Sequence, residues 1–353
     1  MSKPARRDRA PKDVLRSAPP RAASSFAVPA ACLFAVAWLV RLAYLVELDG
    51  TDLFRTPLGD ARGYDLWAQS IAGLRPGADE VFFQAPLYPY VVGLLYAVFG
   101  RSLLAVRVLQ TLAGAAACVL VADTGRRLFR SPHAGLAAGV LLAIYPLGPF
   151  YDGLIEKTSL AVFCLAALLW LLVRADQRRA ARWLVLGGVA AGCLMLLREN
   201  AGVVVPVAVV WLLAGPRTRP RVRRAGDAAV FVAGCFVALA PVAWHNYMYG
   251  AGGIPPTTFQ MGVNLWIGNG RGADGTYRAL DTGHVAYGEE REAAVRYAEA
   301  ARGRRLQPAE VSAFWTERTV AEIVEAPGTW VALMGRKWLL TWSRREWMDS
   351  ESY

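Results

Sequence analysis

The sequence predicts an all-α polytopic membrane protein with about seven transmembrane helices and further juxtamembrane helices at its outer face. Of its 353 residues, 55% are hydrophobic and only 19% are charged, whereas a soluble domain averages about 25% charged residues. The mean hydropathy is +0.29, and long apolar runs alternate with tight basic clusters. Membrane-spanning strands need only about 10 alternating residues, so runs of this length favour a helical bundle.

Seven apolar runs are the predicted crossings. Two of them, 183–197 and 201–215, cover only about 22 Å each at 1.5 Å per residue, less than the roughly 30 Å hydrocarbon core. The turn between them, residues 198–200, is therefore expected near the outer membrane boundary, where ionisable groups face a protein interior or a wet cavity. The runs are 26–46, 102–122, 134–150, 153–173, 183–197, 201–215 and 226–246.

Charge is segregated between the two sides of the predicted bundle. The basic clusters all fall on the side of the N-terminal tail, as seven crossings with a cytoplasmic N-terminus require. This distribution accounts for the net charge of +11 without a nucleic-acid partner. We therefore expect a multi-pass protein of the cell (inner) membrane. The clusters are Arg126, Arg127 and Arg130; Arg174, Arg178, Arg179 and Arg182; and Arg217, Arg219, Arg221, Arg223 and Arg224.

The chain divides into three predicted regions. Residues 1–25 form a disordered basic cytoplasmic tail, and 26–246 form a transmembrane module with an outer loop at 47–85. A cleaved signal peptide is the alternative for the first run, but the run is long, contains Arg41 and lacks a small-residue cleavage site. Residues 247–353 are expected to be an extracytoplasmic loop with amphipathic helices. Helices are predicted at 86–99 (juxtamembrane), 288–303, 308–325 and 329–343 (interfacial).

A polar loop, Gly59 to Asp65, follows the first crossing and carries two acids. Attack by a hydroxyl on a sugar carbon needs a base within hydrogen-bond reach, and Asp60 and Asp65 are the candidates at headgroup depth. The alternative is that both are solvated loop acids near Arg55 and Arg62.

Cations beside the membrane are the candidates for a phosphate group. Arg41 lies inside the first run, where it either snorkels to headgroups or binds a phosphate. Glu156-Lys157 is either a mutually neutralising helix cap or part of a site, and Arg198-Glu199 has the same two interpretations. A leaving phosphate needs such cations. The histidines are dispersed and the five cysteines lie in apolar runs, so no metal site is predicted from them.

The chain resembles the glycosyltransferase-C superfamily, in the branch of protein O-mannosyltransferases and lipid A aminoarabinose transferases. The resemblance runs from about Arg41 to the end of the chain. It is carried by Asp60 four residues before Tyr64, Pro86-Leu87-Tyr88, the helix from Ser102 to Ala115, Glu156, Arg198 with Asn200, Trp244 with Asn246 and Tyr247, the segment Gly262 to Asn269, Lys337-Trp338 and Glu346.

The resemblance implies an inverting membrane transferase that moves a hexose or pentose from a polyprenyl-phosphate donor to a hydroxyl of a lipid, glycan or protein at the extracytoplasmic face. It implies Asp60 as general base, with Asp65 as the second candidate. The resemblance does not fix a cofactor. Some superfamily members hold a divalent cation by acids of the outer loop, and Asp60 and Asp65 are the candidate ligands for such a cation here. The other implied donor-site residues are Arg41, Tyr64, Glu156, Lys157, Arg198, Asn200, Asn264 and Asn269.

Two departures from the family pattern bear on function. Some relatives have an Asp-Glu pair in the first loop, whereas this chain reads Asp60-Ala61, which weighs against a protein-mannosylating role. The family also continues with further membrane helices, so we expect that the chain is truncated or lacks a C-terminal module. Two other functions fit the sequence. One is a carrier or flippase of polyprenyl-linked intermediates, which would share the helices and the outer cations but would not need a catalytic base. The other is a non-catalytic membrane scaffold.

Overall fold

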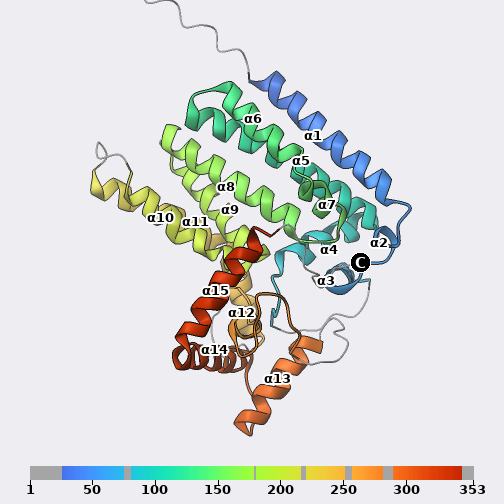
Figure 1. The fold of residues 1–353 in the computed structure, drawn as a ribbon. Helices are drawn as coiled ribbons and strands as arrows, with labels where there is room; N and C mark the ends of the chain where they lie inside the picture. The colour runs from blue at the N-terminus through green and yellow to red at the C-terminus, as the bar shows by residue number, and fades with distance from the viewer. Residues whose placement is uncertain are drawn as a thin grey trace, which may run out of the picture.

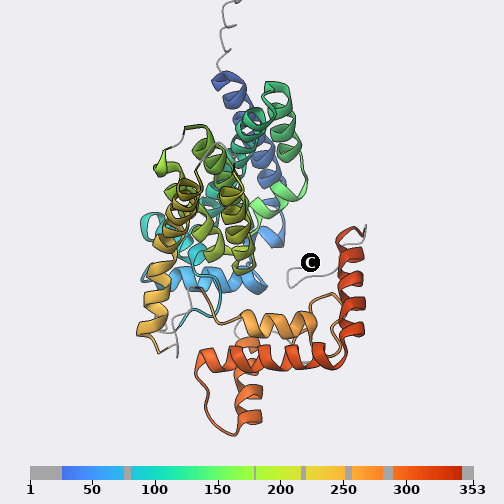
Figure 2. The same cartoon turned by 90° about the vertical axis from the view of Figure 1, so that its left-hand side faces the viewer.

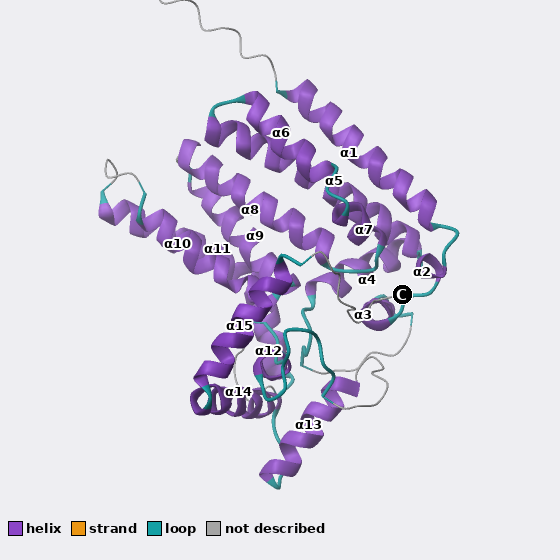
Figure 3. Ribbon diagram, in the orientation of Figure 1, coloured by secondary structure: helices purple, strands orange, loops and turns teal. Residues whose placement is uncertain are grey.

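The computed structural model describes residues 26–74, 81–178, 180–215, 220–250, 257–280 and 289–343. Within these ranges the chain is helical and contains no strand (Figure 3). The predicted tail 1–25, His284 and Glu346 lie outside the described residues. The all-α class predicted from the sequence is confirmed.

A bundle of long helices forms the body of the protein (Figure 1). The predicted helical membrane fold is confirmed, because four helices are long and apolar enough to cross a bilayer, and the bent pair α6 and α7 makes a fifth if counted as one span. The bundle helices are α1 (Ala27–Leu48), α5 (Leu103–Phe129), α6 (Pro132–Ala143), α7 (Leu147–Gly153), α8 (Thr158–Arg178), α9 (Ala181–Leu197), η1 (Glu199–Val203), α10 (Val204–Leu213) and α11 (Arg221–Met248).

The third predicted crossing, 134–150, is broken into α6 and α7, which meet at an angle of 50°. The break ends at Pro146, the residue before α7. Proline lacks the N–H that would continue the helical ladder of α6, so the break is expected at this residue. A second irregular turn, residues 154–157, separates α7 from α8.

The remaining helices lie at one end of the bundle, opposite to the start of α1 (Figure 2). We call this the α3 end. α3 runs across it, α12, α13 and α14 lie beyond α3, and α15 turns back toward the level of α3. α12 packs against α14. The predicted helices at 86–99, 288–303, 308–325 and 329–343 are all present within a few residues. The helices of this end are α2 (Asp52–Arg55), α3 (Gly59–Ile71), α4 (Leu87–Phe99), α12 (Met261–Asn269), α13 (Glu289–Arg302), α14 (Pro308–Glu325) and α15 (Pro327–Thr341).

The prediction that residues Gly59 to Asp65 form a loop is wrong, because these residues form the first turns of α3. Helix α3 packs on α4, and its Tyr64 and Ala68 are buried in a cluster with Tyr88, Val92 and Tyr96. The polar sequence hid an amphipathic helix whose apolar stripe consists of small and aromatic side chains.

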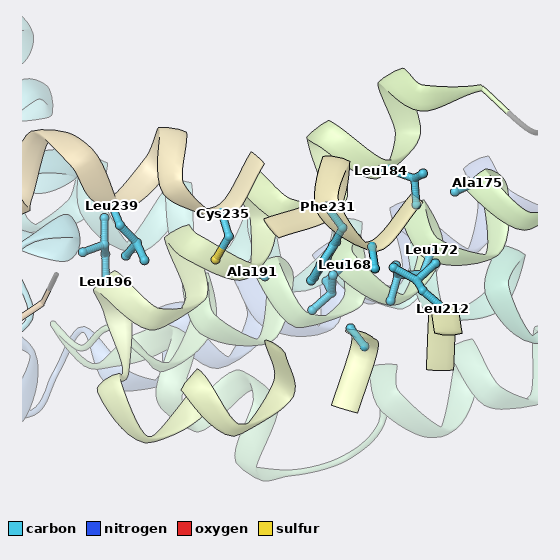
Figure 4. Close-up of a cluster of buried hydrophobic side chains, with 12 residues drawn as sticks. Leu168, Leu172, Ala175, Leu184, Ala191, Leu196, Leu212, Phe231, Cys235 and Leu239 are labelled. Atoms are coloured by element: carbon cyan, nitrogen blue, oxygen red, sulfur yellow. The ribbon is translucent and has the colours of Figure 1, made fainter. Parts of the chain in front are cut away.

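The largest buried apolar cluster joins α8, α9, α10 and α11 (Figure 4). Phe231 of α11 is fully buried there beside Leu168 of α8. Glycines allow the backbones of α9 and α11 to approach closely. A Cβ added at Gly188 would lie 2.7 Å from the backbone nitrogen of Cys235 and would also collide with the carbonyl oxygen of Phe231.

We therefore expect Gly188→Ala to destabilise the bundle by about 1–3 kcal/mol, because an overpacked backbone contact must be relieved. The measurement is the melting temperature of the purified protein in detergent. Gly226→Ala is the matched control, since a Cβ at Gly226 on α11 meets nothing within 4 Å. The control should be neutral or slightly stabilising, and equal melting temperatures for the two variants would contradict the close-packing argument.

Candidate active site at the α3 end

Asp60 lies in the first turn of α3 and is half-buried. None of the hydrogen bonds or ion pairs between described residues involves its side chain. Its carboxylate nevertheless lies close enough to affect its neighbours, because it raises the pKa of Tyr64, Glu156 and Glu290. Asp60 is thus an acid without an internal partner in the described part of the chain, surrounded by other ionisable groups.

Tyr64 lies one turn further along α3 and is fully buried. The Nζ of Lys157 donates a hydrogen bond of 2.6 Å to its hydroxyl. Its ring meets the ring of Tyr88 edge-on, with centroids 5.1 Å apart. Burial raises the pKa of Tyr64 well above its usual value, and the negative charges of Glu156 and Asp60 raise it further. Tyr64 therefore stays neutral and serves as an acceptor for the Lys157 ammonium.

Glu156 and Lys157 occupy the turn between α7 and α8, as predicted for a pair at a helix start. The Glu156 side chain is buried and accepts a hydrogen bond of 2.8 Å from the backbone N–H of Lys157. Burial raises the pKa of Glu156, the charge of Lys157 opposes the shift, and Asp60 adds to it. The positive charge of Arg198 also opposes it, which places Arg198 in the same electrostatic cluster.

Arg198 and Glu199 lie where α9 gives way to the 3-10 helix η1. One terminal nitrogen of Arg198 donates to Thr158 Oγ1 at 2.7 Å, which ties the cation to the start of α8. Glu199 accepts a hydrogen bond of 2.8 Å from the hydroxyl of Thr258, a residue of the C-terminal part of the chain. Asn200 is exposed.

We call Asp60, Tyr64, Glu156, Lys157, Arg198 and Glu199 the α3-end cluster. Glu199 is a member that was not among the predicted site residues, although its adjacency to Arg198 gave a signal for it. Glu290 of α13 is a second missed neighbour. Burial raises its pKa, the hydrogen bond from the Tyr277 hydroxyl opposes that shift, and Asp60 adds to it. Its sequence context gave no signal, because only the fold brings α13 to α3.

Asp65 has a different environment from Asp60, although it lies only five residues later on the same helix. Arg101 donates to both carboxylate oxygens, at 2.8 to 3.1 Å. Tyr96 donates from its hydroxyl at 2.8 Å and Gln69 from its amide at 3.0 Å. With three donors in place, Asp65 joins α3 to the end of α4, and its lone pairs are occupied.

Arg41 points into the bundle, where it is 2% exposed. Its Nε lies 2.6 Å from Asp152 Oδ2, and its other nitrogens contact the carbonyl oxygen of Ala37 and the sulfur of Cys118. Gly114 leaves room for this pair, since a Cβ there would meet both side chains. An internal carboxylate as the partner of Arg41 was not predicted. Removing one member of such a buried pair leaves an uncompensated charge.

Asn264 and Asn269 lie on α12, beyond α3. Asn264 is exposed. The side-chain oxygen of Asn269 accepts from Lys337 Nζ at 3.1 Å and from Trp330 at 3.3 Å, both on α15. Burial lowers the pKa of Lys337. No hydrogen bond in the described residues joins either asparagine side chain to the α3-end cluster, so the structure does not connect all predicted site residues directly.

The divalent-cation site considered from the sequence has Asp60 and Asp65 as its candidate ligands. Within the described residues, no group of three or more histidine, cysteine, aspartate or glutamate side chains is placed to hold a metal ion. Asp65, one of the two acids considered for a divalent cation, is bonded to Arg101. Elsewhere, an apolar groove of about 480 Å³ runs along α1, α5 and α8. Its walls are formed by alanine, leucine, valine and aromatic side chains, and none of the cluster residues borders it.

Part of the chain matches a known protein family. Residues 83–245 match the family described as dolichyl-phosphate-mannose-protein mannosyltransferase. This segment is a glycosyltransferase-C superfamily domain. The family implies membrane glycosyltransferase activity with a polyprenyl-phosphate sugar donor, and a glycan or protein acceptor. No curated protein matches the chain.

The glycosyltransferase-C domain runs from just before α4 into α11. It contains Glu156, Lys157, Arg198 and Glu199 of the α3-end cluster. Asp60 and Tyr64 precede it, and Glu290, the neighbour of the cluster on α13, follows it. The cluster is therefore assembled from the matched domain together with α3, and the family match alone does not assign a role to Asp60.

The raised pKa of Glu156 predicts a pH-dependent stability difference. Because the folded protein raises this pKa, the native state binds more protons than the unfolded state above the ordinary glutamate range, so this group makes stability fall as pH rises. Glu156→Gln removes the free-energy cost of burying an ionised carboxylate. The glutamine side-chain oxygen can still accept the hydrogen bond from the backbone N–H of Lys157. We expect the melting temperature of Glu156→Gln to exceed that of wild type at pH 7–8, and the difference to shrink toward about pH 4.

The control is Glu325→Gln at the exposed end of α14. Its melting temperature should follow wild type across the same pH range. A Glu156→Gln difference that is constant with pH would contradict burial as the cause.

Proposed function

We propose that this protein transfers a sugar from a polyprenyl-phosphate donor to an acceptor hydroxyl at the extracytoplasmic face, with Asp60 as general base and inversion at the sugar carbon. The observation that carries the proposal is the α3-end cluster, in which Asp60, a carboxylate without an internal partner among the described residues, shares the neighbour Glu156 with Lys157 and Arg198. A base for the incoming group and cations for the departing group are the two requirements of such a transfer.

The chemical steps follow from these positions. The acceptor O–H gives its proton to the Asp60 carboxylate while its oxygen forms a bond to the anomeric carbon. The bond from that carbon to the phosphate oxygen breaks on the opposite face, and its electron pair leaves with the polyprenyl phosphate. The developing negative charge is stabilised by Lys157 and Arg198.

Asp60 is the better of the two predicted bases. Asp65 accepts bonds from Arg101, Tyr96 and Gln69, so a substrate hydroxyl would have to displace one of them. The half-buried Asp60 side chain has no such competitor in the described ranges. Its neighbour Glu156 is less suited to abstract a proton from outside, because its side chain is buried against its own turn.

The side of the membrane is proposed from the arginines. The clusters at the end of α5, the end of α8 and the start of α11 lie opposite to the α3 end in the chain's path. Short loops rich in arginine remain in the cytoplasm, which leaves the α3 end outside. A donor whose prenyl chain is dissolved in the bilayer presents its phosphate at headgroup depth, which is where this proposal puts Lys157, the residue before α8.

Substitution of the base tests this assignment. We expect Asp60→Asn to lower the rate of sugar transfer by about 10²–10⁴-fold, the usual contribution of a general base, while the purified protein still binds a polyprenyl-phosphate sugar. The measurement is transfer of radiolabelled sugar in proteoliposomes, with envelope glycans and lipids analysed by mass spectrometry to identify the acceptor.

The matched control is Asp49→Asn, an exposed acid at the end of α1, which should keep wild-type transfer. Wild-type transfer by Asp60→Asn would overturn the base assignment. Unaltered movement of labelled donor across the bilayer, without any transfer by wild type, would instead support a flippase.

A further inference from the structure

Two polar side chains on α5 are fully enclosed in the bundle without belonging to the α3-end cluster. Arg107 is 1% exposed and Gln110 is 0% exposed. They are three residues apart, so they lie on the same face of α5. The guanidinium of Arg107 also lies 3.8 Å from the ring centroid of Phe54. Polar groups buried this deeply are retained in a bundle only when they are hydrogen-bonded.

These two side chains bind three consecutive backbone carbonyls of the turn that follows α7. Arg107 Nε donates to Gly153 O at 2.7 Å. The Gln110 amide nitrogen donates to Asp152 O at 2.9 Å and to Leu154 O at 2.6 Å. The last carbonyls of a helix have no partner within it, and residues 152–154 are buried inside the protein, where a carbonyl needs a donor. The end of α7 is therefore completed by side chains of α5.

Gln110 is also connected, through Tyr88, to Tyr64, which accepts the hydrogen bond of the Lys157 ammonium. The Tyr88 hydroxyl donates to Gln110 Oε1 at 2.6 Å. Tyr88 in turn packs edge-on against Tyr64, whose hydroxyl accepts from Lys157 at 2.6 Å. Gln110 thus fixes the turn that carries Lys157 and, through Tyr88, the ring that receives its ammonium.

We propose that Arg107 and Gln110 are positioning residues that set the placement of Lys157. They act through the carbonyls of residues 152–154 and, for Gln110, also through Tyr88. Their consequence for sugar transfer rests on the proposed function, but the placement of Lys157 does not. Neither residue touches the substrate in this proposal.

Amine reactivity of Lys157 tests the placement without any activity assay. The full-length protein in detergent is treated with an amine-acylating reagent, and the labelled peptides are quantified by mass spectrometry. The sequence has only four lysines, so Lys337 serves as the internal reference. In Gln110→Leu we expect Lys157 to be labelled about tenfold faster, which corresponds to about 1.4 kcal/mol of lost restraint.

Thr111→Val is the matched control, because Thr111 is the adjacent residue on α5, is equally buried and accepts a hydrogen bond from Trp38 of α1. It should leave the labelling of Lys157 unchanged. Tyr88→Phe is a milder second variant that keeps the ring against Tyr64 and removes only the hydroxyl, and it should raise labelling by a smaller factor. Wild-type labelling in both Gln110→Leu and Tyr88→Phe, with Lys337 unchanged, would overturn the proposal.

Transfer activity then separates this proposal from the proposed function. If Gln110 acts through Lys157, Gln110→Leu should lower transfer in wild type but have little further effect in a Lys157→Ala background. An equal loss in both backgrounds would mean a general structural role and would overturn the positioning role in transfer. Faster labelling in a protein that shows no transfer with any polyprenyl-phosphate sugar would leave the placement standing and refute the function.

Discussion

The hydrogen bonds from α5 to the turn after α7 are the interaction on which the rest of the structure depends. A backbone carbonyl that is buried inside a protein must find a hydrogen-bond donor within the protein. Where α7 ends at Gly153 and α8 has not yet begun, the backbone is buried and that requirement is met by Arg107 and Gln110. An irregular backbone can be buried here because polar side chains from a neighbouring helix bind its carbonyls.

This broken turn gives the protein a place for charges. A continuous helix would bury its backbone groups internally and would present only side chains to the neighbouring helices. The break instead allows Glu156 and Lys157 to lie against Tyr64, within electrostatic reach of Asp60. The ion pair of Arg41 with Asp152 supports the same segment, because Gln110 also binds the carbonyl of Asp152. The cluster and the bundle core are thus two parts of one polar network.

Much of the fold was predictable from hydropathy, since each apolar run overlaps a bundle helix, although α5 continues to Phe129, past the predicted end at 122, and α8 begins at Thr158 instead of 153. The site was predictable only in part. Glu156, Lys157 and Arg198 stand out as charges beside apolar runs, and the structure brings them together with Asp60. The sequence could not reveal that Asp65 would be engaged by Arg101, because that contact joins the middle of α3 to the connection between α4 and α5. Nor could it reveal Gln110, whose role depends on carbonyls that only a broken helix exposes.

The bond between Thr258 and Glu199 has a consequence for dissecting the protein. The membrane bundle ends with α11 at Met248, which makes it a natural place to cut the chain. A fragment cut there would leave the Glu199 carboxylate without its hydroxyl donor, beside the cations assigned to the phosphate. It would also lack Glu290 opposite Asp60. The smallest active unit is therefore expected to extend past the bundle into the helices that follow it, even though the matched family domain ends at residue 245.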